Sequence, residues 1–274
     1  MNERRIAANG IDFTVLEAGR GPLALCLHGF PDSPHSFEPL LADLAVAGFH
    51  AVAPFMRGYA PTSVAPDGTY GLGALASDAN ALHEALGGDG RAVLIGSDWG
   101  AEATYVAGLT GPARWRRLVT LAIPPLALDE RLFADPGQRE RFAYMSVLAS
   151  PGAPAVVAAD DFALVDRLWR QWSPGHDARR DATHAKRCLR DPDHLAAALA
   201  PYRAPDPGPL RLTPPQPTLY LHGEDDGCID VRLIRDAEAH LAPGSRLDVL
   251  PGVGHFLHAE EPAAVSARVL DWMG

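Results

Sequence analysis

Short apolar segments alternate with longer helical segments along most of the chain, and this alternation restricts the possible folds more than any other feature. The apolar segments are bounded by glycine or proline, as is typical of buried strands. We predict strands at residues 11–17, 23–27, 49–53, 92–95, 118–123, 218–221 and 246–250. We predict helices at residues 40–47, 70–86, 99–109, 231–241 and 261–273. This order indicates an α/β fold with a mostly parallel central sheet that carries helices on both faces.

The alternation is interrupted after residue 123. From Pro124 to about Arg211 the sequence has helical segments and no convincing strand. The candidate helices are residues 126–133, 138–148, 160–172 and 194–199. A proline-rich stretch at residues 205–217 closes this region. The simplest organisation is therefore one α/β core, formed by residues 1–123 and 213–274, with an inserted helical cap at residues 124–212.

Composition and charge narrow the class of protein. Apolar residues make up 47% of the 274 residues, which is enough for a sizeable core. The 24 Lys and Arg residues face 34 Asp and Glu residues, and this net charge of −10 argues against nucleic-acid binding. No segment approaches the roughly 18 apolar residues of a membrane span. Because no signal-peptide pattern follows Met1, we expect a cytoplasmic protein that makes no membrane contact, and the sequence leaves a homo-oligomer open.

One predicted strand meets its helix with almost no loop between them. Residues 93–101 read Val-Leu-Ile-Gly-Ser-Asp-Trp-Gly-Ala, so that Gly96 and Gly100 flank Asp98. This is the pattern of a nucleophile elbow with Asp in place of Ser. Such a turn admits only small neighbours and exposes its central side chain at the carboxyl ends of the strands, where open α/β sheets bind ligands. Asp98 is therefore a candidate nucleophile; the alternative is that it only caps the following helix.

A histidine and two acidic residues follow later strands. His255 lies in a glycine-rich loop directly after the last predicted strand. The strand at 218–221 runs into an acidic loop that contains Asp225 and Asp226, and a buried carboxylate there would orient His255 and stabilise its protonated form. Asp226 is the better candidate for this acid and Asp225 is the alternative. The order of nucleophile, acid and histidine is the order found in α/β-hydrolases.

Two backbone N–H groups are candidates for an oxyanion hole. The strand at 23–27 ends in His28-Gly29-Phe30-Pro31. An N–H group just beyond such a strand end can act together with the N–H group that follows the nucleophile. These groups belong to Phe30 and Trp99, whereas His28 itself is expected to be structural.

The chain resembles the α/β-hydrolase superfamily over essentially its whole length. The resemblance rests on motifs in the right order: His28 to Pro31, Arg57-Gly58-Tyr59, Gly96 to Gly100, Gly223 to Asp226, and Gly254-His255-Phe256. The Asp-Trp pair at the elbow resembles the aspartate branch, and within it the epoxide hydrolases. Haloalkane and haloacid dehalogenases are close relatives of that group. The resemblance implies an α/β-hydrolase fold with an inserted helical cap.

The resemblance also implies a reaction. Asp98 would attack saturated carbon and form an alkyl-enzyme ester, which water activated by His255 would then hydrolyse. In epoxide hydrolases, two cap tyrosines donate to the epoxide oxygen; here the cap contains Tyr144 and Tyr202, which resemble that pair. The implied activity is the opening of a small apolar epoxide to a vicinal diol.

Two alternatives and one misleading motif accompany this interpretation. A dehalogenase would use the same Asp98 and His255 on an organohalide, with Trp99 as one donor to the halide and Trp169 or Trp172 of the cap as the other. A binding protein without turnover is the alternative from another class.

The segment from Gly71 to Ala76 matches a dinucleotide fingerprint, but it follows a turn and not a buried strand. We therefore expect no nucleotide cofactor, and with no metal-binding motif in the sequence we expect no metal.

Overall fold

The structure is a computed structural model that describes residues 1–204 and 212–274. Within these residues, eight strands form one sheet in the order β1-β2-β4-β3-β5-β6-β7-β8. The strands are β1 (Asn2–Ala8), β2 (Ile11–Ala18), β3 (Leu23–Leu27), β4 (His50–Pro54), β5 (Val93–Ser97), β6 (Arg117–Leu121), β7 (Thr218–Gly223) and β8 (Arg246–Leu250). The β1–β2 and β2–β4 pairs are antiparallel and the other pairs are parallel. The predicted mostly parallel sheet is thus confirmed.

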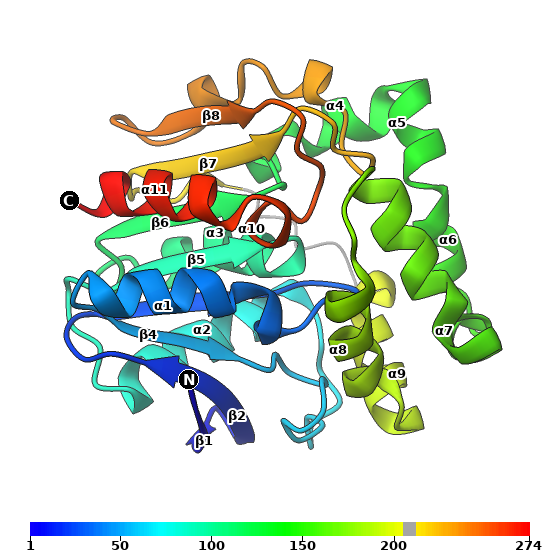
Figure 1. Cartoon of the computed structure of the whole chain (residues 1–274), viewed down its shortest axis with the longest axis horizontal. Coiled ribbons are helices and arrows are strands. Elements are labelled where there is room, and N and C mark those ends of the chain that lie inside the picture. The colour runs from blue at the N-terminus through cyan, green and yellow to red at the C-terminus, as the bar shows by residue number, and fades with distance from the viewer. Residues whose placement is uncertain (205–211) are drawn as a thin grey trace.

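Helices cover both faces of the sheet, as the alternation of strands and helices predicts. Helices α1 (Glu38–Val46) and α11 (Pro262–Met273) lie side by side on one face, and α2 (Leu72–Ala85) and α3 (Trp99–Thr110) lie on the other (Figure 1). Strands β3 and β5 are buried along their whole length, because helices pack on both sides of them. This burial explains why these strands are continuous apolar runs in the sequence.

A helical insertion at about residues 126–203 separates β6 from β7 and lies beyond the carboxyl ends of the parallel strands (Figure 1). We call it the cap. Its helices are α4 (Asp129–Ala134), α5 (Pro136–Arg141), α6 (Ala143–Ala149), α7 (Ala153–Trp172), α8 (Arg179–Leu189) and α9 (Pro192–Leu199). The cap is predicted to end at residue 212. Residues 205–211, just before this boundary, lie outside the described residues. The cap therefore covers the edge at which the candidate site residues emerge.

The helix predicted at residues 231–241 is wrong. The structure has two short 3-10 helices there, Val231–Leu233 and Ala237–His240. A continuous α-helix would use the carbonyl of Leu233 for the N–H of Ala237. Arg131 of α4 donates to that carbonyl instead, and the Ala237 N–H bonds to Ile234. A contact from the cap thus replaces a bond that the helix would need.

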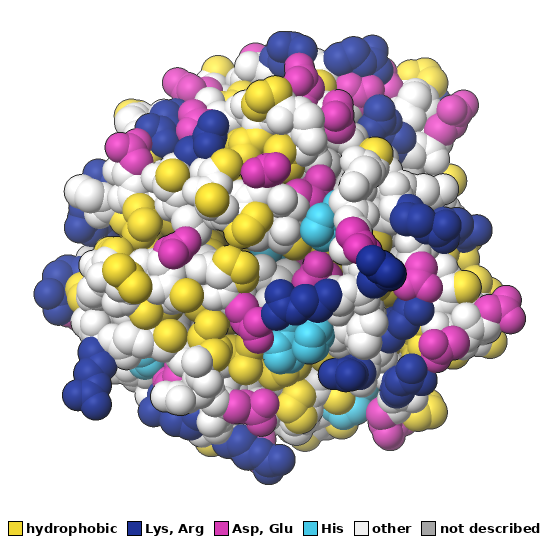
Figure 2. Space-filling view, viewed as in Figure 1, with side chains coloured by type: hydrophobic (Ala, Val, Ile, Leu, Met, Phe, Trp, Pro, Cys, Tyr) yellow, Lys and Arg dark blue, Asp and Glu magenta, His cyan; other side chains and the backbone are white. Residues whose placement is uncertain are grey.

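The surface is mixed in charge. On the face shown in Figure 2, basic and acidic side chains are interspersed over both the core and the cap. Within the described residues, no single helix is long and apolar enough to cross a membrane. By length and composition alone, the segments Pro136–Ala149 and Ala153–Trp172 would pass that test together, although they are bent by 108°.

Candidate active site

Asp98 lies at the sharp junction between β5 and α3. Its backbone has φ 53° and ψ −127°, a strained conformation for a residue with a side chain. The chain can turn this tightly only because the residues two positions before and two positions after Asp98 are glycines. A Cβ atom on Gly96 would lie 2.1 Å from the carbonyl oxygen of Gly100, and one on Gly100 would lie 2.1 Å from that of Leu27. The elbow geometry predicted from the sequence is therefore present.

The Asp98 carboxylate is held from two sides. The backbone N–H of Phe30 donates to Oδ1 at 2.7 Å, and Nε2 of His255 lies 3.5 Å from Oδ2. Gly29 makes the first contact feasible, because a Cβ atom there would lie 2.2 Å from Oδ1 of Asp98. The Phe30 N–H predicted for the oxyanion hole is thus aimed at one carboxylate oxygen, and Trp99 begins the helix that follows Asp98.

The histidine and the acid form a buried pair. Nδ1 of His255 lies 3.0 Å from Oδ2 of Asp226, and both residues are buried. The other carboxylate oxygen of Asp226 accepts the N–H groups of Cys228 at 2.6 Å and Ile229 at 3.0 Å. Asp225, the alternative acid, is exposed. The structure therefore brings Asp98, His255 and Asp226 together in one line of contacts.

The charges around His255 favour its protonated form. Burial opposes protonation, but the carboxylates of Asp226 and Asp98 outweigh it and raise the pKa of His255 from 6.5 to about 10. Burial likewise disfavours the ionised form of Asp226, yet His255 lowers the pKa of this carboxyl below its usual value. At neutral pH the resting site thus holds an imidazolium between two carboxylates.

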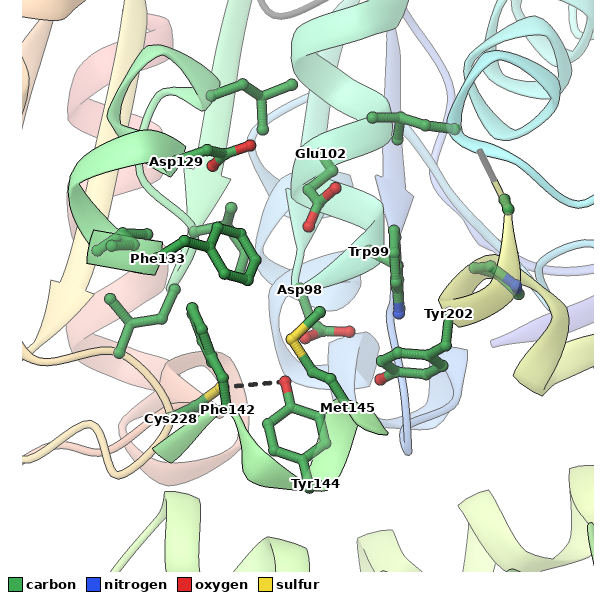
Figure 3. A pocket seen from close by; sticks show the side chains of 17 residues that line it. Asp98, Trp99, Glu102, Asp129, Phe133, Phe142, Tyr144, Met145, Tyr202 and Cys228 are labelled. Carbon is green, nitrogen blue, oxygen red and sulfur yellow. Dashed lines mark hydrogen bonds between the residues drawn. The ribbon is translucent and has the colours of Figure 1, made fainter. Parts of the chain in front are cut away.

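A cavity of about 170 Å³ opens above Asp98. Most of its lining is apolar, from residues of the core and of cap helices α4 and α6. Both predicted cap tyrosines line it, and Figure 3 shows their hydroxyl groups directed toward the space beside Asp98. The ring of Tyr202 packs against those of Phe30 and Trp99, with centroids 5.6 Å and 5.2 Å away. The cavity therefore presents a carboxylate and two phenols to the same small space.

Both phenols are held in the protonated state. Burial raises the pKa of Tyr144 and of Tyr202 well above their usual range, and the charge of Asp98 adds to the rise for each. The hydroxyl of Tyr144 lies 3.6 Å from Sγ of Cys228 (Figure 3). Each tyrosine can consequently act as a hydrogen-bond donor in the cavity at neutral pH.

His28 and Trp169, which the sequence also singled out, have other partners. His28 is buried, and its ring nitrogens bond the carbonyl of Gly29 at 2.9 Å and the N–H of Met56 at 3.1 Å. The indole N–H of Trp169 donates to the carbonyl of Pro31 at 2.8 Å, which occupies the group considered as a halide donor. Within the described residues, no group of three or more His, Cys, Asp and Glu is arranged to hold a metal ion.

Several residues of the site were missed from the sequence. Glu102 and Asp129 line the cavity with Cys228, and Gln138 and Ser173 contact the loops that carry Asp226 and His255. Glu102 follows Asp98 by four residues on α3, so helical spacing could have placed it at the same end of the helix. The cap residues carry no comparable signal, because their contacts join parts of the chain that are far apart in sequence.

Comparisons with known proteins identify the fold. The family model described as alpha/beta hydrolase fold matches residues 22–150. The AB hydrolase superfamily protein YfhM of Bacillus subtilis is 28% identical, over 98% of this chain and 96% of the relative. The epoxide hydrolase of Caballeronia sordidicola is 29% identical, over 100% of this chain and 94% of the relative.

Solved structures extend the likeness to three dimensions. The crystal structure of a putative epoxide hydrolase from Klebsiella pneumoniae superposes with a TM-score of 0.84 at 25% identity, covering 99% of this chain and 97% of the other. A putative acyltransferase from Salmonella enterica has a TM-score of 0.87 at 20% identity, covers 99% and 94% of the two chains, and shares the fold alone. The chain is therefore an α/β-hydrolase fold protein that resembles epoxide hydrolases over its full length.

Proposed function

We propose that the protein is an epoxide hydrolase, which converts a small apolar epoxide to a vicinal diol through a covalent ester on Asp98. The observation that carries the proposal is the cavity in which the Asp98 carboxylate faces two protonated phenols. A carboxylate can attack saturated carbon, and a phenol can donate a proton to the oxygen that leaves. The relatives named as epoxide hydrolases support the same assignment.

In the first step, a carboxylate oxygen of Asp98 attacks one epoxide carbon. Because Oδ1 is held by the Phe30 N–H, we assign the attack to Oδ2. A carbon–oxygen bond forms to Oδ2 as the epoxide carbon–oxygen bond breaks. The electron pair goes to the epoxide oxygen, which takes a proton from Tyr144 or Tyr202. The product is a hydroxyalkyl ester and one tyrosinate. The proton of the His255 imidazolium then passes to this tyrosinate, which restores the tyrosine and leaves His255 neutral.

In the second step, water attacks the carbonyl carbon of this ester. Nε2 of His255 takes a proton from the water, and the developing negative charge falls on Oδ1, where the Phe30 N–H already donates. The bond between the carboxyl carbon and Oδ2, which is now the ester oxygen, breaks. Oδ2 leaves with the product and takes the proton from His255. The Asp98 carboxyl then gives its proton to Nε2 of His255, which restores the carboxylate and the imidazolium of the resting site. The sum is one epoxide and one water converted to one diol.

The pKa of His255 suits this sequence. In the resting site two carboxylates stabilise the imidazolium. Esterification removes the charge of Asp98, and the pKa of His255 falls because one of the groups that raised it is gone. The histidine thus becomes a base when the ester is present, which is the state in which a base is needed.

A product assay tests the proposal. Purified protein is incubated with aryl and aliphatic epoxides and, separately, with haloalkanes and haloacetates. We expect diol without halide release, and a drop of about 10²-fold in diol formation when Tyr144 and Tyr202 are both replaced by Phe. Tyr70→Phe is the matched control, because Tyr70 contacts the backbone of Ala65 outside the cavity. Halide release without diol would contradict the proposal and assign the site to the dehalogenases.

A further inference from the structure

The loop that carries His255 is held through three consecutive backbone N–H groups. The N–H of Gly254 donates to Oε2 of Glu260 at 2.8 Å. The N–H of His255 donates to the carbonyl of Trp172 at 2.9 Å. The N–H of Phe256 donates to Oγ of Ser173 at 3.0 Å. Both the histidine and its two neighbours are therefore fixed by groups outside the loop, and two of the three acceptors belong to the end of cap helix α7.

Ser173 and Glu260 are also bonded to each other. The hydroxyl of Ser173 donates to Oε1 of Glu260 and accepts the N–H of Phe256. Ser173 is therefore bonded both to the residue after His255 and to the side chain that holds the residue before it. Ser173 is fully buried. The two side chains form a bridge that closes around the histidine backbone from Gly254 to Phe256.

The cap backbone comes so close to the loops that glycine is required on both sides of it. A Cβ atom on Gly254 would lie 2.5 Å from Cα of Ser173, and one on Gly227 would lie 1.8 Å from the carbonyl oxygen of Gln171. The N–H of Gly227, next to Asp226, donates to the same Trp172 carbonyl as His255 does. The end of α7 is thus wedged between the loops of the acid and the histidine.

We propose that Ser173 and Glu260 are positioning residues for His255, so that the cap fixes the histidine of the core in the geometry that ester hydrolysis requires. This inference rests on the proposed function, because it assigns the two residues to its second step. Asp98 is held independently by its own elbow and by the Phe30 N–H. Loss of the bridge therefore slows the hydrolysis of the ester and spares its formation.

The test compares Ser173→Ala and Glu260→Gln with two matched controls. Ser266→Ala removes another buried serine hydroxyl, in α11, and Glu261→Gln neutralises the exposed neighbour of Glu260. The substrate probe is styrene oxide. Rapid quenching followed by intact-mass spectrometry measures how fast the ester forms on Asp98 and how fast it disappears. Circular dichroism checks that each variant is folded.

We expect the ester to disappear about tenfold more slowly or worse in Ser173→Ala and Glu260→Gln, since small displacements of a catalytic group cost that much. Its formation should stay within about twofold of the wild type. The ester then accumulates in both variants and in neither control. Hydrolysis at the wild-type rate in folded variants, or an equal slowing of both steps, would overturn the proposal. If Ser173→Ala does not fold, Glu260→Gln decides the question.

A failure of the proposed function is recognised separately. In that case the wild type itself forms neither ester nor diol from the epoxide. Amide hydrogen exchange at residues 254–256 then decides the inference without a substrate. Faster exchange of these amides in Ser173→Ala than in Ser266→Ala would support the proposal that Ser173 positions the loop of His255. Equal exchange in the two variants would rule this proposal out.

Discussion

Asp98 and His255 are positioned in opposite ways. The backbone of Asp98 is fixed locally, by a strand, a turn and a helix within residues 93–110 and by two glycines that allow the turn, and the Phe30 N–H adds one contact to its carboxylate. The histidine lies in a loop whose N–H groups are bonded to the cap and to α10 (Leu257–Glu260). A short segment can therefore specify the nucleophile, whereas the base depends on contacts across most of the chain.

The acid follows the pattern of the histidine. Cap helix α5 contacts its loop through Gln138, whose amide bonds the carbonyl of Cys228 at 2.7 Å and the N–H of Asp230 at 2.9 Å. Arg141 donates to the carbonyl of Asp226 at 2.6 Å. The cap thus has two roles in one insertion, because it lines the cavity above Asp98 and also braces the loops of its two partners.

The largest effect is expected at the locally fixed residue. Asp98→Ala removes the carboxylate that we assign as the nucleophile and should lower diol formation by about 10⁴-fold or more. The elbow backbone does not need this side chain, so the variant should unfold cooperatively like the wild type. Diol yield and thermal unfolding are the two measurements. Unchanged diol formation would remove the covalent mechanism.

His255→Gln separates the two steps of the reaction. Turnover should fall by about 10³-fold, because no base remains to activate water. Ester formation should persist, since Asp98 keeps its own support. Intact-mass spectrometry after exposure to an epoxide should find one substrate molecule bound per protein. A folded variant that carries no adduct would contradict the role given to His255.

The raised pKa of His255 predicts how stability depends on pH. Its value in the folded protein, about 10, lies above the ordinary value of 6.5. The protonated histidine therefore stabilises the folded state fully below about pH 6.5, and this contribution is lost as the pH rises through about 10. The free energy of unfolding of the wild type should fall by about 2–5 kcal/mol more than that of His255→Gln over this window. Urea unfolding at both ends of the window measures the difference; parallel losses in the two proteins would show that the histidine is not charged in the resting site.

The smallest effect is expected at Gln138, which holds the loop of Asp226 through two hydrogen bonds. Gln138→Met should lower turnover by about tenfold through the loop of Asp226, and it should also cost about 1–3 kcal/mol of stability through its lost hydrogen bonds. Gln216→Met is the matched control, because Gln216 is also buried but bonds the carbonyls of Gly108 and Pro112 away from the site. Urea unfolding and kcat are measured for both. Equal losses of activity in the two variants would show that only stability matters.

The same contrast explains what the sequence could reveal. The parallel strands and the elbow could be predicted because each is encoded in a short, buried, apolar segment. Their order along the chain also brought His255 and Asp226 to the same edge of the sheet as Asp98. The separation of Asp226 from Asp225 required the structure, since it depends on which side chain turns inward toward the histidine.

Other elements lacked such a local signal. In β1 only Ile6 is buried, so the strand shows almost no apolar pattern. Helix α8 buries chiefly small residues among many charged ones, and it was not predicted. Ser173 and Gln138 are polar residues in a helical region, and only the folded chain brings them to loops more than 80 residues away. Their roles follow from tertiary contacts, which single-sequence patterns do not contain.

The covalent ester is the central claim, and one experiment addresses it directly. A single turnover is run with enzyme in excess over epoxide, in water enriched in the heavy oxygen isotope. Because water attacks the carboxyl carbon of Asp98, the label should enter the peptide that contains Asp98, and the diol should carry an unlabelled oxygen from the protein. Label found in the diol, with none in that peptide, would mean that water attacks the epoxide directly and that Asp98 is not the nucleophile.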